Sequence, residues 1–175
     1  MAAVPSVAVA VVPYDPDWPA RFAALAERVT RAFAHAPAIA LRVEHVGSTA
    51  VPGLCAKPVI DLDVLVAADD LPAAIARLAT LGYVHEGDKG IAGREAFAWP
   101  AGEARHHLYL GTPDASPIRD HLAFRDHLRA HPEVAADYAA RKRELATRFA
   151  HDRGAYQAGK DAFVAAVTAR ARGAG

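Results

Sequence analysis

VEHVGSTA at residues 43–50 and KPVIDLDVLV at residues 57–66 put a Gly-Ser turn after one apolar segment and two aspartates inside the next. Successive side chains of a β-strand point to opposite faces, so Asp61 and Asp63 share one face and their apolar neighbours take the other. The β-branched and aliphatic flanks favour a buried central strand. Two neighbouring carboxylates in such a strand repel each other and need a counter-charge.

A divalent cation is the usual source of that counter-charge. Mg²⁺ binds one or two carboxylates together with phosphate oxygens of a substrate, so we expect Asp61 and Asp63 to hold Mg²⁺ or Mn²⁺. Glycine allows a ligand to approach the backbone closely, and Gly47, Ser48 and Thr49 are therefore candidate phosphate-binding residues. A solvated edge strand with two acids is the simpler interpretation, and the apolar flanks disfavour it.

The bulk composition restricts the class of protein. The chain has 175 residues, of which 53% are apolar and 23% charged, and this fits a single domain over residues 1–175. The formal net charge is zero, which disfavours bulk binding of nucleic acid. Residues 1–12 are too short to span a bilayer, so no membrane partner is expected. With Cys55 as the one cysteine no disulfide framework exists, and a cytoplasmic location is the default.

Hydrophobic periodicity predicts an α+β fold with a mixed sheet, helices packed on it and a helical C-terminal part. Predicted helices cover residues 19–34 and 71–81, and three more follow from residue 117 onward. Predicted strands cover residues 39–46, 58–66, 83–86, 95–99 and 105–110, the last two as a hairpin.

Segments spread over nearly the whole chain carry a recognisable pattern: residues 12–16 (VPYDP), 45–54 (HVGSTAVPGL), 57–58 (KP), 60–64 (IDLDV), 106–108 (HHL), 124–126 (FRD) and Tyr156. Together they resemble the GrpB family, which is grouped with the nucleotidyltransferase superfamily. The resemblance implies a nucleotidyltransferase-like fold. It also implies two metal ions that bridge Asp61, Asp63 and a nucleoside triphosphate, activate an acceptor and stabilise the leaving pyrophosphate.

One departure from the superfamily pattern concerns the third carboxylate, which such enzymes place on a following strand. The matching segment, residues 105–110, contains no acid, and His107 stands there instead. Glu95 in the neighbouring strand is the nearest acid that could substitute. A histidine favours Zn²⁺ or Mn²⁺ over Mg²⁺, or it acts as a general base as neutral imidazole.

Further residues are candidates with simpler structural alternatives. His45 either faces the same cleft as Asp61 or is a strand histidine satisfied by the backbone. His106 and His107 alternate, so one faces the site and the other does not.

Cationic residues could contact an anionic ligand. Lys57 at the mouth of the aspartate strand could steady a phosphate, and Lys160 could meet the nucleotide. His121, Arg125 and Arg129 share one helical face, which reads as mixed-charge surface. Arg125 and Tyr156 are retained as nucleotide-binding candidates because they lie in the GrpB-like segments.

Three functions remain open from the sequence. The first is a metal-dependent nucleotidyltransferase that acts on an unknown small-molecule or protein acceptor. The second is a nucleotide- or metabolite-binding module without turnover. The third is a histidine and aspartate metal site with hydrolase chemistry. The identity of the acceptor and the oligomeric state cannot be read from the chain.

Overall fold

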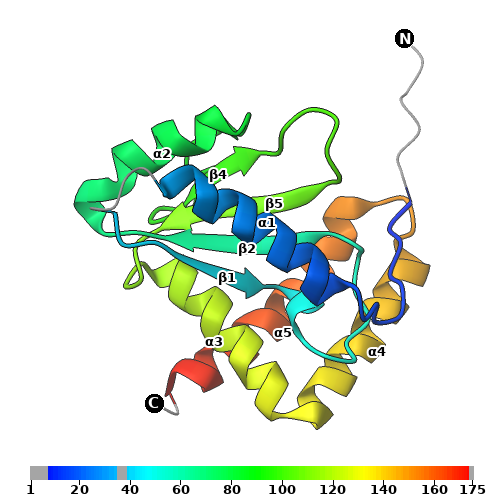
Figure 1. Ribbon diagram of the computed structural model, residues 1–175. Coiled ribbons are helices and arrows are strands. Elements are labelled where there is room, and N and C mark those ends of the chain that lie inside the picture. Colours follow the sequence, from blue (N-terminus) through cyan, green and yellow to red (C-terminus); the bar gives the residue numbers. More distant parts are fainter. Residues whose placement is uncertain (1–7, 35–38, 174–175) are drawn as a thin grey trace.

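The computed structural model describes residues 8–34 and 39–173 (Figure 1). Its helices are α1 (Trp18–Phe33), η1 (Ser48–Ala50), η2 (Ala68–Asp70), α2 (Leu71–Thr80), α3 (Ser116–Ala130), α4 (Pro132–Arg148) and α5 (Arg153–Gly173). Its strands are β1 (Arg42–Val46), β2 (Ile60–Leu65), β3 (Val84–His85), β4 (Glu95–Ala98) and β5 (His106–Gly111).

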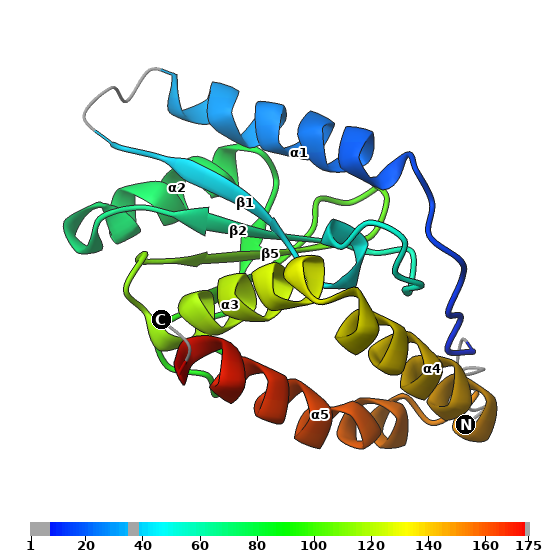
Figure 2. The ribbon, with the colours of Figure 1, turned by 90° about the horizontal axis from the view of Figure 1, so that it is seen from below.

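The strands form one mixed sheet in the order β1-β2-β5-β4-β3. Strands β2 and β5 are parallel, and the other neighbours are antiparallel. The sheet with helices on both faces confirms the predicted α+β class (Figure 2). The central position of β2 agrees with its continuous apolar flanks, which are typical of a strand buried on both faces.

Helices α1 and α2 cover one face of the sheet (Figure 2). The apolar side chains of the two central strands point toward them and form the main core. Its buried members are Val29, Phe33, Leu62, Val64, Val66, Ala74, Leu78, Tyr83, Phe97, Leu108 and Leu110. Both helices begin with a proline in the first turn, Pro19 and Pro72, where a missing N–H breaks no helical hydrogen bond.

Helices α3, α4 and α5 lie on the opposite face (Figure 2). Asp61 and Asp63 point toward this face, since Asp63 contacts His121 of α3 and Asp61 lines a cavity with residues of α4 and α5. A second core joins them to the loop between β1 and β2. Its buried members are Val51, Leu54, Cys55, Phe124, Leu128, Tyr138, Ala139 and Val167. The three helices thus cover the aspartate face of the sheet, but their apolar side chains do not fill the space next to Asp61.

Element boundaries differ from the expected ones mainly at chain segments of weak periodicity. The first strand is shorter than the predicted residues 39–46, and β3 has only two residues. The last helix, α5, continues to Gly173. Within the described residues, no helix has both the length and the apolar character needed to cross a membrane.

Candidate functional site

Strand register brings the first aspartate and a histidine together. Asp61 of β2 lies opposite His107 of the parallel strand β5, so both side chains emerge on the same face. His107 Nδ1 donates a hydrogen bond of 2.6 Å to Asp61 Oδ1, and each side chain is 27% exposed. Since Nδ1 carries the proton, Nε2 is the basic atom of a neutral His107 imidazole.

The Gly-Ser turn closes directly against this pair. Gly47 has φ +72°, in the left-handed region, and a Cβ at this position would overlap Asp61 Oδ2 and lie 3.0 Å from Asp61 Cγ. Only glycine allows the backbone to approach the carboxylate so closely. The turn then enters η1, whose first residue, Ser48, lies within hydrogen-bond reach of the Tyr138 side chain.

The second aspartate has a different environment. Asp63 has 0% relative exposure, and its two oxygens lie 2.9 and 3.1 Å from Nδ1 of His121, which comes from α3. Burial raises the pKa of Asp63, and the hydrogen bond from His121 opposes that shift. Asp63 is absent from the lining of the neighbouring cavity, whereas Asp61 is part of it.

A cavity of about 910 Å³ lies over Asp61 and His107, between the sheet and helices α4 and α5. Gly47, Ser48 and Thr49 form part of its wall, and Tyr138 and Tyr156 contribute aromatic rings. Its volume is in the upper part of the range for small-molecule and cofactor sites.

Positive charge is concentrated in this cavity although the chain as a whole is neutral. Seven cationic side chains line it against two carboxylates, Asp61 and Glu86. The cations are Lys57, Lys89, Arg94, Arg105, Lys142, Arg153 and Lys160. Lys89 pairs with Glu86, and within the described part of the chain the other six have no carboxylate within 4.0 Å.

The pKa values of three cavity lysines are lowered, because burial and neighbouring positive charges disfavour their charged forms. Lys142 is 2% exposed, and burial lowers its pKa to about 7. Lys160 is 9% exposed, and burial together with repulsion from Lys57 lowers its pKa to about 8. Burial, followed by repulsion from Arg153, also lowers the pKa of Lys57. An anion bound among these groups would stabilise their charged forms.

Aromatic rings and one carbonyl hold the lysines in place. The ammonium groups of Lys57 and Lys160 lie 5.4 and 4.7 Å from the centroid of the Tyr156 ring. Lys142 Nζ lies 4.5 Å from the Tyr138 centroid and donates to the carbonyl oxygen of Cys55. Cation–π contacts steady these charges without neutralising them.

Three candidate residues from the sequence lie on the opposite face of the sheet. His45 pairs in register with Leu62, stacks on Phe22 of α1, and shares a hydrogen bond of 2.9 Å with Thr49 Oγ1. Of the two alternatives for His45, the one that places it in the cleft of Asp61 is therefore wrong, and its ring partner is the Thr49 hydroxyl, not the backbone. Thr49 itself lines the cavity, but its hydroxyl is engaged by His45.

His106 and Glu95 also point away from Asp61. His106 donates from Nδ1 to the carbonyl of Ala104 and accepts from the Tyr83 hydroxyl, which confirms that His106 and His107 take opposite faces. Glu95 lies opposite Leu110 in the register and binds His85 Nε2 at 2.6 Å. Glu95 therefore cannot replace the third carboxylate.

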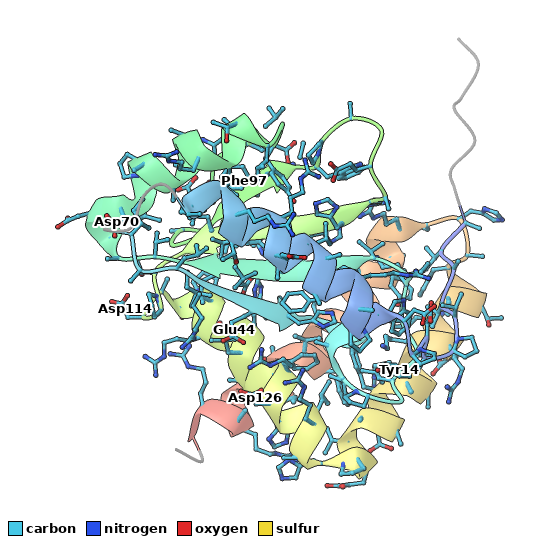
Figure 3. The ribbon with its side chains drawn as sticks, viewed as in Figure 1. Tyr14, Glu44, Asp70, Phe97, Asp114 and Asp126 are labelled. Carbon is cyan, nitrogen blue, oxygen red and sulfur yellow. The ribbon has the colours of Figure 1, made fainter. Side chains whose placement is uncertain are left out.

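Arg125 also differs from its predicted role as a nucleotide-binding residue. Its guanidinium binds Glu44, its neighbour Asp126 and the carbonyl oxygen of His45, and Arg125 does not line the cavity. Glu44 and Asp126 are labelled in Figure 3, on β1 and on α3. With two carboxylates in contact, Arg125 joins α3 to the edge of the sheet and is not available to a nucleotide in the cavity.

Several residues of the site were only weak candidates in the sequence or, like Tyr109, were not candidates at all. His121 shares its helical face with Arg125 and Arg129, and this face packs on β1, β2 and the following turn; it is not the solvated surface that the mixed charges suggested. Arg94 and Tyr109 extend the polar face of the sheet beyond His107. Lys142 and Arg153 complete the cationic wall, and their helical spacing alone could not show that they turn inward.

The donor atoms fit a divalent cation only in part. Among the described residues, no group of three or more histidine, cysteine and carboxylate side chains is arranged to hold a metal ion. Asp61 opens into the cavity and can bind one hard cation together with phosphate oxygens and water. Asp63 is enclosed and bound to His121, so the two-ion arrangement implied by the resemblance does not fit the conformation described here.

Comparison with known proteins gives consistent results. A family model described as "GrpB protein" matches residues 8–170. UPF0157 protein PA4798 of Pseudomonas aeruginosa is 44% identical over 166 residues, which cover 92% of this chain and 66% of the relative, so the chain spans just under two thirds of that protein.

Solved structures give the same assignment of fold. The crystal structure of conserved protein GrpB from Enterococcus faecalis superimposes with a TM-score of 0.80 at 30% identity, covering 93% of this chain and 96% of the other. A chain of the GLD-2/RNP-8 complex superimposes with a TM-score of 0.52 at 16% identity, over 85% of this chain and 58% of the other, a likeness of fold alone. These likenesses confirm the nucleotidyltransferase-like fold.

Proposed function

Because the chain belongs to the GrpB family and has a nucleotidyltransferase-like fold, we propose that it binds a nucleoside triphosphate in the cavity over Asp61 and transfers the nucleotidyl group to an acceptor. One observation carries the proposal: six cationic side chains face this cavity without a carboxylate partner among the described residues. Lys142 and Lys160 are buried, Lys57 and Arg94 are partly buried, and Arg105 and Arg153 are exposed at the cavity mouth. Buried cations without a carboxylate partner are unfavourable unless a ligand supplies the negative charge.

The triphosphate lies nearest to Lys57, Arg105, Arg153 and Lys160 in this proposal. Besides burial, the charges of Arg153 and Arg105 lower the pKa of Lys57, and the charge of Asp61 raises it. The charge of Lys57 in turn lowers the pKa of Lys160. These interactions support the proximity of the four cations to one another and to Asp61. Backbone N–H groups of the Gly47 turn add neutral donors beside Asp61. Charge-assisted hydrogen bonds to phosphate are about twice as strong as neutral ones.

One divalent cation, Mg²⁺ or Mn²⁺, accompanies the nucleotide and is held by Asp61. Such a cation neutralises charge on the phosphates when it is bound. Asp61 is suited to this role because it is partly exposed in the cavity wall, and Gly47 leaves space for the carboxylate.

His107 acts as the general base in the proposed transfer. Its Nδ1–H is committed to Asp61, so Nε2 accepts the proton of an acceptor hydroxyl or amine. The acceptor oxygen or nitrogen forms a bond to the α-phosphorus, the bond from that phosphorus to the bridging oxygen breaks, and pyrophosphate leaves. General base catalysis by a positioned side chain typically contributes about 10²- to 10⁴-fold in rate.

A second candidate function is nucleotide binding without turnover. The enclosed Asp63 and the lack of an acid on the cavity face of β5 favour it. A binding module would retain the cationic wall and would not need a second open carboxylate.

Incubation with each of the four nucleoside triphosphates and Mg²⁺ or Mn²⁺ tests both functions. We expect one or more of them to bind, and pyrophosphate to be released during an acceptor screen. His107→Gln should retain binding and lose release. Binding without release under every acceptor condition would leave the second function. Failure of all four nucleotides to bind, with Asp61→Asn indistinguishable from wild type, would exclude both.

A further inference from the structure

Arg94 lines the cavity, has no ion pair within the described residues and lacks a full set of hydrogen bonds. It precedes β4, and its guanidinium carbon lies 4.2 Å from the centroid of the Tyr109 ring. Its Nε is buried and has no hydrogen-bond partner within the described structure. A buried donor of this kind costs free energy unless a partner arrives.

Strand β5 sets the position of Arg94 relative to the reacting groups. Arg105, His107 and Tyr109 follow one another at two-residue spacing, which places successive side chains about 7 Å apart on one face of a strand. The rings of His107 and Tyr109 are 6.4 Å apart between centroids. His107 therefore lies between the cationic wall at Arg105 and the Arg94–Tyr109 pair.

The nearby acids do not satisfy Arg94. The charge of Arg94 lowers the pKa of Asp63, against the larger opposite effect of burial. Asp63 is nevertheless hydrogen-bonded to His121, and no ion pair joins it to Arg94. Glu86 at this end of the cavity is engaged by Lys89 at 2.7 Å. The Tyr109 hydroxyl oxygen lies within hydrogen-bond reach of Arg94, from which it accepts, and its O–H remains able to donate to a ligand.

We propose that Arg94 and Tyr109 form a second oxyanion site, which binds a phosphate or carboxylate group of the acceptor. The guanidinium fork suits either oxyanion. This inference rests on the proposed function for the name of the ligand, because an acceptor anchored here would present its nucleophile to His107 while the triphosphate occupies the opposite end. The acceptor class is then a small anionic molecule, and about 910 Å³ is room for it beside a nucleotide.

Titration of inorganic phosphate by calorimetry tests the site independently of nucleotide binding. The apoprotein should bind phosphate at two sites. Arg94→Met should weaken one of them at least about 10-fold, which corresponds to 1.4 kcal/mol. Lys160→Met should weaken the other, and Arg119→Met, which removes the same charge from an exposed position of α3, should weaken neither.

The second arm repeats the titration with a saturating non-hydrolysable nucleoside triphosphate. One phosphate site should remain in wild type and be lost in Arg94→Met. Repeating the titration with succinate in place of phosphate distinguishes an acceptor that carries a carboxylate from one that carries a phosphate. Complete competition between phosphate and nucleotide, or an unchanged isotherm in Arg94→Met, would overturn the second site. If the nucleotide does not bind while the Arg94-dependent site persists, the proposed function fails and the oxyanion site stands. Arg94→Lys, which keeps the charge without the fork, and a thermal melt of each variant separate loss of binding from loss of fold.

Discussion

His121 holds the carboxylate of Asp63 with one nitrogen, at 2.9 and 3.1 Å from its two oxygens, on a residue without exposed surface. This contact joins α3 to the central strand of the sheet. The two aspartates therefore have different roles. Asp61 faces the cavity and can contact a ligand, whereas Asp63 is buried and links the sheet to α3. A buried carboxylate with one partner depends strongly on that partner.

His121→Ala should therefore destabilise the protein by about 1 to 3 kcal/mol, the range for a buried polar group that loses its hydrogen bond. Urea unfolding followed by circular dichroism measures the change. His85→Ala is the matched control, since it removes an imidazole from Glu95 where both side chains are about one-third exposed. Exposed pairs contribute about 0 to 1 kcal/mol. Equal losses in the two variants would show that burial of Asp63 gives the contact no special weight.

Gly47→Ala should destabilise more than Gly53→Ala. Both glycines have positive φ, +72° and +78°, where alanine is strained, and the ψ of −173° at Gly47 adds to the strain because that combination is essentially restricted to glycine. At Gly53 a Cβ would meet nothing within 4 Å, whereas at Gly47 it would overlap Asp61 Oδ2. The difference in free energy of unfolding between the variants reports the clash with Asp61 together with the greater backbone strain at Gly47. Nucleotide affinity should fall in Gly47→Ala alone, and equal behaviour of the two variants would contradict the close approach.

The stability of the protein should rise with pH between 7 and 9. The pKa of Lys142 falls from 10.5 to about 7 on folding, so the unfolded chain binds more protons in this interval and deprotonation favours the folded state. The slope is at most about 1.4 kcal/mol per pH unit for one such group. Lys160, with a pKa of about 8, adds in the same direction.

Thermal melts at several pH values, compared between wild type and Lys142→Met, measure this dependence. The variant should have a flatter profile and a higher stability at pH 7, since methionine fills the site without a charge. A profile as steep in the variant as in wild type would show that Lys142 does not carry the effect.

The sequence was sufficient where a rule acts within one strand. Alternation along β2 predicted that Asp61 and Asp63 share a face, and alternation along β5 predicted that His106 and His107 do not. Both relationships are present in the structure.

Relationships between strands were not accessible in the same way. The sequence left open whether His45 and Glu95 face the cleft, because a one-residue difference in register sends a side chain to the opposite face. His45 lies opposite Leu62, and Glu95 opposite Leu110. Nothing in the local sequence of either strand specifies that pairing.

Helical spacing correctly predicted which residues share a helical face, but it did not predict whether that face points to solvent or to the protein interior. His121 and Arg125 share a face of α3, as predicted, but that face packs on the sheet. Lys142 and Lys160 turn into a cavity that exists only because three helices stand over the aspartate face. The sequence therefore located the centre of the site, at Asp61, better than its cationic wall.

Whether the cavity over Asp61 binds a nucleotide can be measured by titrating a non-hydrolysable nucleoside triphosphate with Mg²⁺ into wild type, Lys57→Met, Lys160→Met and Arg119→Met. We expect binding by wild type and by Arg119→Met, and affinities at least about 10-fold weaker in the two lysine variants. We also expect proton uptake near pH 8, seen as a dependence of the heat on the buffer, because the bound polyanion raises the pKa of Lys160. Absence of binding by wild type, or equal affinity in all four proteins, would contradict the proposal that this cavity binds a nucleotide.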